Sequence, residues 1–135
     1  MNINQQGRVD NTMDKGKLVL IVDDDSRNIF ALRLALKSRG YRTLSCQSAI
    51  EGIKILAQEP EIGVVLMDMM MPEMDGYEAI RIIRGHTEYD HIPIIAVTAQ
   101  AMAGDREKCL EAGAFSYISK PVDIDKLVVA LEKIA

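Results

Sequence analysis

The stretch EIGVVLMDMMMPEMDG, from Glu61 to Gly76, decides the fold of this chain. Its apolar run, Ile62 to Met67, has the length and the branched side chains of a buried strand, and it ends in a single carboxylate, Asp68. The pair Asp75-Gly76 then has the turn and N-cap chemistry that starts a helix. Because open α/β sheets bind their ligands beyond the carboxyl ends of the strands, this pattern predicts that Asp68 lies at a ligand site.

Length and composition indicate one domain with a sizeable core, since the chain has 135 residues and 48% hydrophobic content. No apolar run approaches about eighteen residues, so we expect no membrane span. The N-terminus lacks the apolar centre of a signal peptide, which makes the cytoplasm the expected location. A net charge of −4 argues against a nucleic-acid surface. Cys46 and Cys109 show no metal-ligand spacing and are expected to be reduced packing thiols.

Strand and helix patterns alternate along the chain. Strands are predicted over residues 17–22, 41–46, 62–67, 92–97 and 115–118, and helices from Ser26 to the cap at Gly40, from Ser48 to before Pro60, over 77–84, over 101–112, and from the cap at Asp123 onward. Crossovers of this length require parallel strands with helices on both faces. We therefore predict a flavodoxin-like, doubly wound five-stranded parallel sheet of order 2-1-3-4-5 with five helices, in three α/β/α layers. The domain is expected to span residues 17–135, after a flexible polar tail over residues 1–16.

Polar groups follow four of the predicted strands: Asp23 and Asp24 after the first, Asp68 after the third, Thr98 after the fourth and Lys120 after the fifth. In the predicted order the first and third strands are neighbours at the switch point of the sheet, so the three carboxylates should converge. Like charges this close need a proton or a cation among them. Oxygen ligands alone select Mg²⁺, or Mn²⁺, over zinc.

Lys120 and Thr98 suit the rest of such a site. An ammonium group and a hydroxyl can hold the phosphate oxygens for which Mg²⁺ leaves coordination positions open. A carboxylate, a metal ion, an ammonium group and a hydroxyl together predict phosphoryl transfer to or from Asp68. For Asp68 alone a helix cap is an equally good interpretation, but the combination of residues argues against it. The extra acid Asp25 is expected to face solvent.

Four motifs, in this order and spacing, resemble the receiver domain of two-component response regulators. They are the acidic pair in LVLIVDDDSRN, the block LMDMMMPEMDG, the strand end IIAVTA and the ending YISKP. The resemblance covers Lys17 to Ala135. The segments MPEMDGYEAIR and TAQAMAGDREKCLEAGA are similar to receivers of hybrid histidine kinases, and whether the chain is a stand-alone regulator or a domain of that lineage stays open.

The resemblance implies that Asp68 is the phosphoacceptor. It implies that Asp24 binds Mg²⁺ directly and Asp23 mainly through water, with the backbone carbonyl of Met70 as a further ligand. The remaining implied roles are phosphoryl contacts for Thr98 and Lys120, a cis peptide at Lys120-Pro121, a switch that couples Tyr117 to Thr98, phosphate access past Ala99, and tuning of phosphate loss by Met70 and Gln100. A half-buried edge aromatic is the simpler interpretation of Tyr117.

The function implied is a phosphorylation switch rather than an enzyme with a separate substrate. A phosphohistidine of a sensor kinase or phosphotransfer protein would donate to Asp68, and the domain would catalyse its own phosphorylation and dephosphorylation. The output is expected to be a contact with a target protein through the face of the fourth helix, fifth strand and fifth helix. We expect neither a nucleic-acid nor a membrane partner.

Three other functions compete with this one. An aspartyl-nucleophile phosphatase of the haloacid dehalogenase type fits the fragment Asp23-x-Asp25, but Arg27 stands where that family has Thr or Val, and the chain is short. A flavodoxin-like cofactor binder needs a Ser/Thr/Gly-rich loop after the first strand, where three aspartates would instead repel a flavin phosphate. A docking module that works without phosphorylation remains open.

Overall fold

The computed structural model describes residues 18–99 and 104–134. The expected tail over residues 1–16, the tuning residue Gln100 and the expected first turn of the fourth helix lie outside the described residues. The elements are β1 (Leu18–Val22), α1 (Ser26–Ser38), β2 (Arg42–Cys46), α2 (Ala49–Gln58), β3 (Ile62–Asp68), α3 (Gly76–Arg84), β4 (Ile94–Thr98), α4 (Asp105–Ala112), β5 (Ser116–Ser119) and α5 (Ile124–Glu132).

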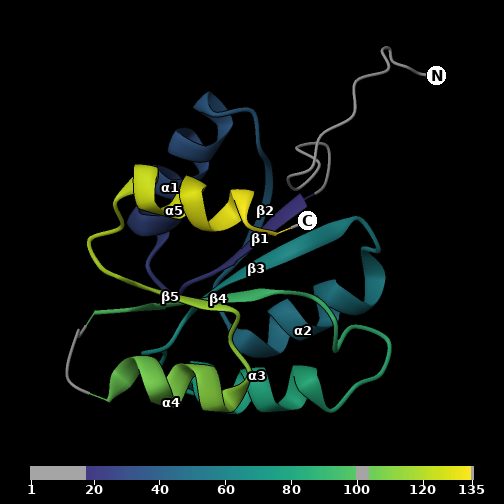
Figure 1. Cartoon of the computed structure of the whole chain (residues 1–135). Coiled ribbons are helices and arrows are strands. Elements are labelled where there is room, and N and C mark those ends of the chain that lie inside the picture. Colours follow the sequence, from purple (N-terminus) through teal and green to yellow (C-terminus); the bar gives the residue numbers. More distant parts are fainter. Residues whose placement is uncertain (1–17, 100–103, 135) are drawn as a thin grey trace.

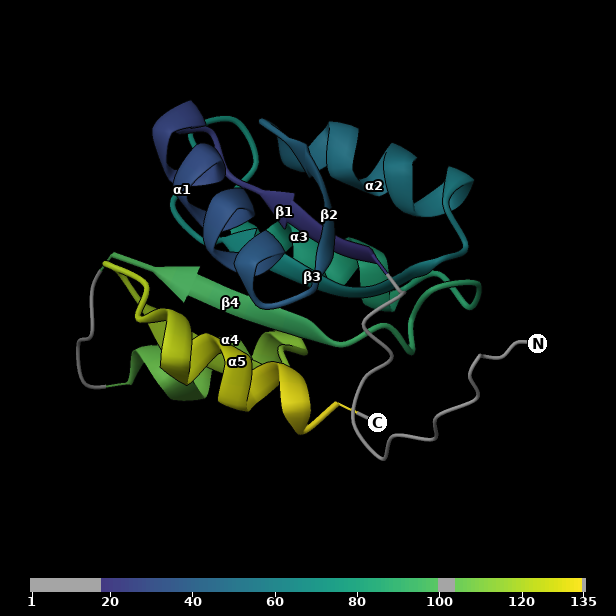
Figure 2. The same cartoon turned by 90° about the horizontal axis from the view of Figure 1, so that it is seen from above.

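The five strands form one parallel sheet in the order β2-β1-β3-β4-β5. Helices α1 and α5 cover one face, and α2, α3 and α4 cover the other (Figures 1 and 2). Every residue of β1 and β4 is buried, as in a strand packed on both faces. The predicted flavodoxin-like fold and strand order are confirmed.

Two apolar cores hold the three layers together. One lies between the sheet and α2, α3 and α4, and the other between the sheet and α1 and α5. Alternate residues of a strand serve opposite cores: Leu20 packs into the first, whereas Val19 and Ile21 pack into the second. Within the described part of the chain, no helix is both long and apolar enough to cross a bilayer.

Helix starts follow the predicted caps. The side chains of Ser48, Asp75 and Asp123 accept hydrogen bonds from backbone N–H groups in the first turns of α2, α3 and α5. Asp25 does the same for α1, accepting from the backbone N–H of Arg27 at 2.9 Å. Its side chain is also 36% exposed, as expected of an acid that faces solvent.

Most described element boundaries agree with the prediction to within one residue, and the start of β4 differs by two. Strand β4 begins at Ile94 rather than at residue 92, because Pro93 between them has no N–H to donate to a ladder. Helix α4 is described from Asp105, and Gly104 before it has a φ of 94° and lies in the left-handed region, through which an α-helix does not continue. The expected residues 101–103 lie outside the described residues.

Candidate metal and phosphoryl-transfer site

Three carboxylates meet at the carboxyl edge of the sheet. Val22 pairs with Met67 across β1 and β3, so the residues that follow them, Asp23 and Asp68, come side by side. Asp23 and Asp68 are only 3% and 2% exposed, whereas Asp24 is exposed. One oxygen from each of these three carboxylates lies within 4.8 Å of the others. The convergence that the strand ends predict is present.

The two buried carboxylates are held in the same way. Asp23 Oδ1 accepts a hydrogen bond from the backbone N–H of Asp25 at 2.8 Å, and Asp68 Oδ1 accepts one from the N–H of Met70 at 3.0 Å. In each loop, the backbone N–H two residues after the aspartate donates to that aspartate's own side chain, and the chain turns at this point. This arrangement leaves the second oxygen, Oδ2, of each carboxylate turned to the site.

Lys120 bridges these second oxygens. Its Nζ lies 3.4 Å from Asp23 Oδ2 and 3.6 Å from Asp68 Oδ2. The lysine follows β5, its backbone N–H donates to the carbonyl of Thr98 at 2.7 Å, and its peptide bond to Pro121 is cis, as the resemblance implies. The ammonium group is thus fixed between two buried acids.

Charge in the site is not balanced by these groups. Three carboxylates and one ammonium group sum to a formal charge of −2. Burial raises the pKa of Asp68, and the charges of Asp23 and Asp24 raise it further, while the Met70 hydrogen bond and the Lys120 charge act in the opposite direction. All three carboxylates offer hard oxygen atoms as metal ligands, and one of them, Asp24, is exposed to solvent. These residues therefore fit Mg²⁺ or a similar cation.

Three other predicted residues lie around this cluster. Thr98 ends β4 beside Asp68 on β3 and is 3% exposed. Ala99 follows it and is exposed, and Met70 is 57% exposed at the rim above Asp68. Their roles in phosphate contact, phosphate access and phosphate loss stay predictions.

Tyr117 lies on β5, opposite Ala96 of β4, and is partly buried against the core beneath α4. Burial raises the pKa of its hydroxyl, and the charges of Asp105 and Cys109 raise it further. Because both groups belong to α4, the ring faces that helix. Its coupling to Thr98 stays a prediction.

Gly76, which the sequence predicts only as part of a turn, also contributes to the site. A Cβ at this position would come within 2.8 Å of the Cα of Met69 and would also overlap the Met69 Sδ. Helix α3 therefore begins directly against the residue after Asp68, and only glycine allows this approach. An aspartate-glycine pair gives no signal that separates this packing role from an ordinary turn.

Comparison with known proteins gives consistent matches along most of the chain. The model of the response regulator receiver domain family matches residues 19–132. The polar-differentiation response regulator DivK of Brucella ovis is 36% identical over 116 residues, which cover 86% of this chain and 94% of that protein.

Solved structures agree with these matches. The receiver domain of a sensor histidine kinase from Pseudomonas aeruginosa, with a magnesium ion coordinated in its active site cleft, is similar with a TM-score of 0.80 at 35% identity, covering 88% of this chain and 97% of that chain. A response regulator receiver protein from Pseudomonas putida gives a TM-score of 0.80 at 33% identity, covering 87% of this chain and 96% of that chain.

Proposed function

Because the chain belongs to the response regulator receiver domains, we propose that it accepts a phosphoryl group on Asp68 from a phosphohistidine of a histidine kinase or phosphotransfer protein. The observation that carries this proposal is the position of Asp68: it is buried, one oxygen is held by Met70, and the other faces Lys120 and two further acids. A receiver of this kind is a signalling switch. We place its domain at residues 17–135 and its partners in the cytoplasm.

In the proposed step, an oxygen of Asp68 attacks the phosphorus and forms an acyl phosphate. The bond from phosphorus to the imidazole nitrogen breaks and its electron pair stays on that nitrogen. Because the other ring nitrogen of the phosphohistidine carries a proton, a neutral imidazole remains on the donor. Lys120 and Thr98 hold the phosphoryl oxygens as charge builds on them. Asp23, Asp24, Asp68 and the Met70 carbonyl would hold Mg²⁺, which would supply the positive charge that this site lacks. Hydrolysis of the acyl phosphate, tuned by Met70 and Gln100, returns the switch to its resting state.

The proposed output face is the one formed by α4, β5 and α5. A groove of about 460 Å³ lies along this face, and Phe115 and Val129, which help to line it, are 45% and 51% exposed. Exposed apolar side chains in a groove suit a protein contact. Tyr117 helps to line this groove and belongs to the strand that leads to Lys120, which supports its proposed part in the switch.

The deciding experiment is intact-mass analysis after incubation with acetyl phosphate, with and without Mg²⁺. We expect one phosphoryl adduct that requires Mg²⁺ and is absent from Asp68→Ala. Asp75→Asn is the matched control, because Asp75 lies in the same loop but caps α3, a task that asparagine also performs. An adduct that persists in Asp68→Ala, or no adduct on the folded wild-type protein, would contradict the proposal and favour a docking module.

A further inference from the structure

Methionines flank the phosphoacceptor along the chain, and one of them differs from the others in its exposure. Met67, Met69 and Met71 are buried in the apolar core beneath α2, α3 and α4, whereas Met70 is 57% exposed and belongs to neither core. The Met69 sulfur, for example, lies against the glycine that starts α3. An oxidant in solution can therefore reach the Met70 thioether in the folded protein, while packing shields the other three.

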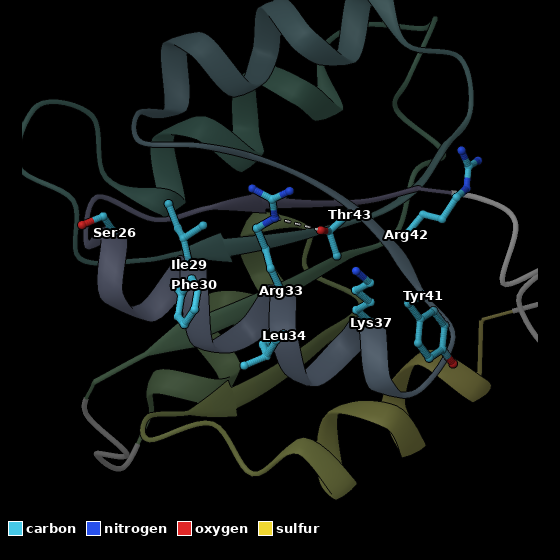
Figure 3. A pocket seen from close by; sticks show the side chains of 9 residues that line it. All are labelled: Ser26, Ile29, Phe30, Arg33, Leu34, Lys37, Tyr41, Arg42 and Thr43. Carbon is cyan, nitrogen blue, oxygen red and sulfur yellow. Dashed lines mark hydrogen bonds between the residues drawn. The ribbon is translucent and has the colours of Figure 1, made fainter.

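Other sulfur atoms in the described part of the chain are less accessible. Cys46 and Cys109 are buried, and Met74 is partly buried against the same core. The groove along α1 and β2, shown in Figure 3, and the groove on the output face have no methionine or cysteine in their linings. Among the residues that the structure describes, Met70 thus has the sulfur most open to an oxidant.

Met70 is also tied to the phosphoacceptor. Its backbone N–H donates to Asp68 Oδ1 at 3.0 Å, so the residue stays beside the buried carboxylate while much of its surface remains in solvent. Around Asp68, the exposed residues of the site are Asp24, Met70 and Ala99. Water that hydrolyses an acyl phosphate on Asp68 therefore arrives from the side on which Met70 lies.

Oxidation changes what this side chain can do for such a water molecule. A thioether is only a weak hydrogen-bond acceptor. A peroxide transfers one oxygen atom to the sulfur: the O–O bond breaks, an S–O bond forms, the sulfur is oxidised by two electrons, and water leaves as the reduced product. The sulfoxide oxygen carries partial negative charge, so it is a good acceptor where the thioether was a poor one.

We infer that Met70 is a reversible oxidation site at which a peroxide shortens the lifetime of the acyl phosphate on Asp68. The effect on lifetime rests on the proposed function, whereas the modification does not. The sulfoxide oxygen accepts a hydrogen bond from the water that attacks phosphorus, and the bond from phosphorus to Asp68 breaks with its electron pair returning to the carboxylate. Reduction by two thiols restores the thioether and yields a disulfide and water.

Peptide mapping by tandem mass spectrometry tests the modification. The protein is treated with hydrogen peroxide for increasing times, once folded and once in denaturant, and then digested. In the folded protein we expect Met70 to gain oxygen at least about tenfold faster than Met67, Met69 or Met71, and in denaturant all four should react at similar rates. Similar rates in the folded protein would overturn the inference.

The lifetime is followed by intact mass after acetyl phosphate is removed and Mg²⁺ is kept. We expect the phosphoryl adduct to disappear about fivefold faster from the oxidised protein, a change on the scale of one hydrogen bond in the transition state. Methionine sulfoxide reductases for both epimers, with dithiothreitol, should restore the original mass and the original rate.

Two variants assign the effect to one sulfur atom. Met70→Leu removes the thioether and keeps a similar volume, so its rate of phosphoryl loss should be the same before and after peroxide. Met74→Leu is the matched control from the same loop, and its rate should still rise about fivefold on oxidation. Both variants keep the methionines outside the described residues, so oxidation there is common to both.

Three results would overturn the inference about lifetime. They are an equal acceleration in oxidised Met70→Leu, an unchanged or slower loss from protein whose Met70 is oxidised, and a fall of more than about 5 °C in the unfolding temperature, which would mean that oxidation damages the fold. The proposed function fails differently, because the folded, untreated protein would then take no adduct at all.

Discussion

Asp68 lies almost fully buried beside a second buried carboxylate, Asp23, and both share the ammonium group of Lys120. Removing one partner of a buried ionic cluster leaves uncompensated charge, which commonly costs about 3–5 kcal/mol. We predict that Lys120→Met lowers the free energy of unfolding by about 3 kcal/mol at neutral pH. Denaturant titration measures this change.

The cause of that loss can be separated from lost packing. Adding Asp68→Asn to Lys120→Met should restore much of the stability, because it removes one of the two stranded charges. If the double variant were no more stable than Lys120→Met alone, the loss would come from the lysine's aliphatic stem rather than from its charge.

The raised pKa of Asp68 has its own consequence for stability. A carboxyl group whose pKa is higher in the folded than in the unfolded protein, ordinarily about 3.8, destabilises the fold once it ionises. Without Mg²⁺, Asp68→Asn should therefore raise the free energy of unfolding by about 0.5–2 kcal/mol at neutral pH. The gain should shrink as the pH falls through the raised pKa and vanish below about 3.8. A gain that stayed constant down to acid pH would contradict this assignment.

At the scale of elements, α3 is set against the phosphoacceptor strand by the glycine that starts it. Gly76→Ala would place a Cβ 2.8 Å from the Cα of Met69, a backbone atom that cannot move alone. We predict a loss of about 1–3 kcal/mol, measured by thermal unfolding, and slower labelling by acetyl phosphate because Asp68 adjoins Met69.

Gly85, at the other end of α3, provides the control. A Cβ there meets its nearest atom at 3.4 Å, and its φ of −80° suits any residue. Gly85→Ala should therefore change stability by less than about 0.5 kcal/mol and leave labelling intact. Equal losses of stability at the two positions would mean that glycine is needed at both only for its backbone flexibility.

The elements differ in how well the sequence predicts them. The runs that become β1 and β3 are apolar and end in aspartates, so local pattern and tertiary role agree, and they predict the acid cluster. Arg84 shows the limit: its guanidinium, whose pKa burial lowers, donates to the carbonyls of Asp90, Ile92 and Gly113. Those partners are backbone atoms brought in by tertiary folding, so no residue pattern marks them.

At the scale of the whole molecule, the negatively charged site brings together residues from distant parts of the chain, because they follow β1, β3 and β5. A cation that binds only the folded site stabilises all of the protein, by about 1.4 kcal/mol at ten times its dissociation constant. We predict that Mg²⁺ raises the unfolding temperature by about 5 °C and that EDTA reverses the rise.

Variants of two neighbouring acids distinguish binding of Mg²⁺ at a specific site from general screening of the protein's charge. Asp24→Asn should abolish the rise, whereas Asp25→Asn removes the same charge one residue away and should keep it, since asparagine still caps α1. The scans are run at constant ionic strength, with Na⁺ in place of Mg²⁺ as the reference. An equal rise in both variants would show that Mg²⁺ acts on the diffuse negative charge of the protein. A rise confined to proteins with Asp24 would place the ion at the cluster beside Asp68, where the proposed chemistry needs it.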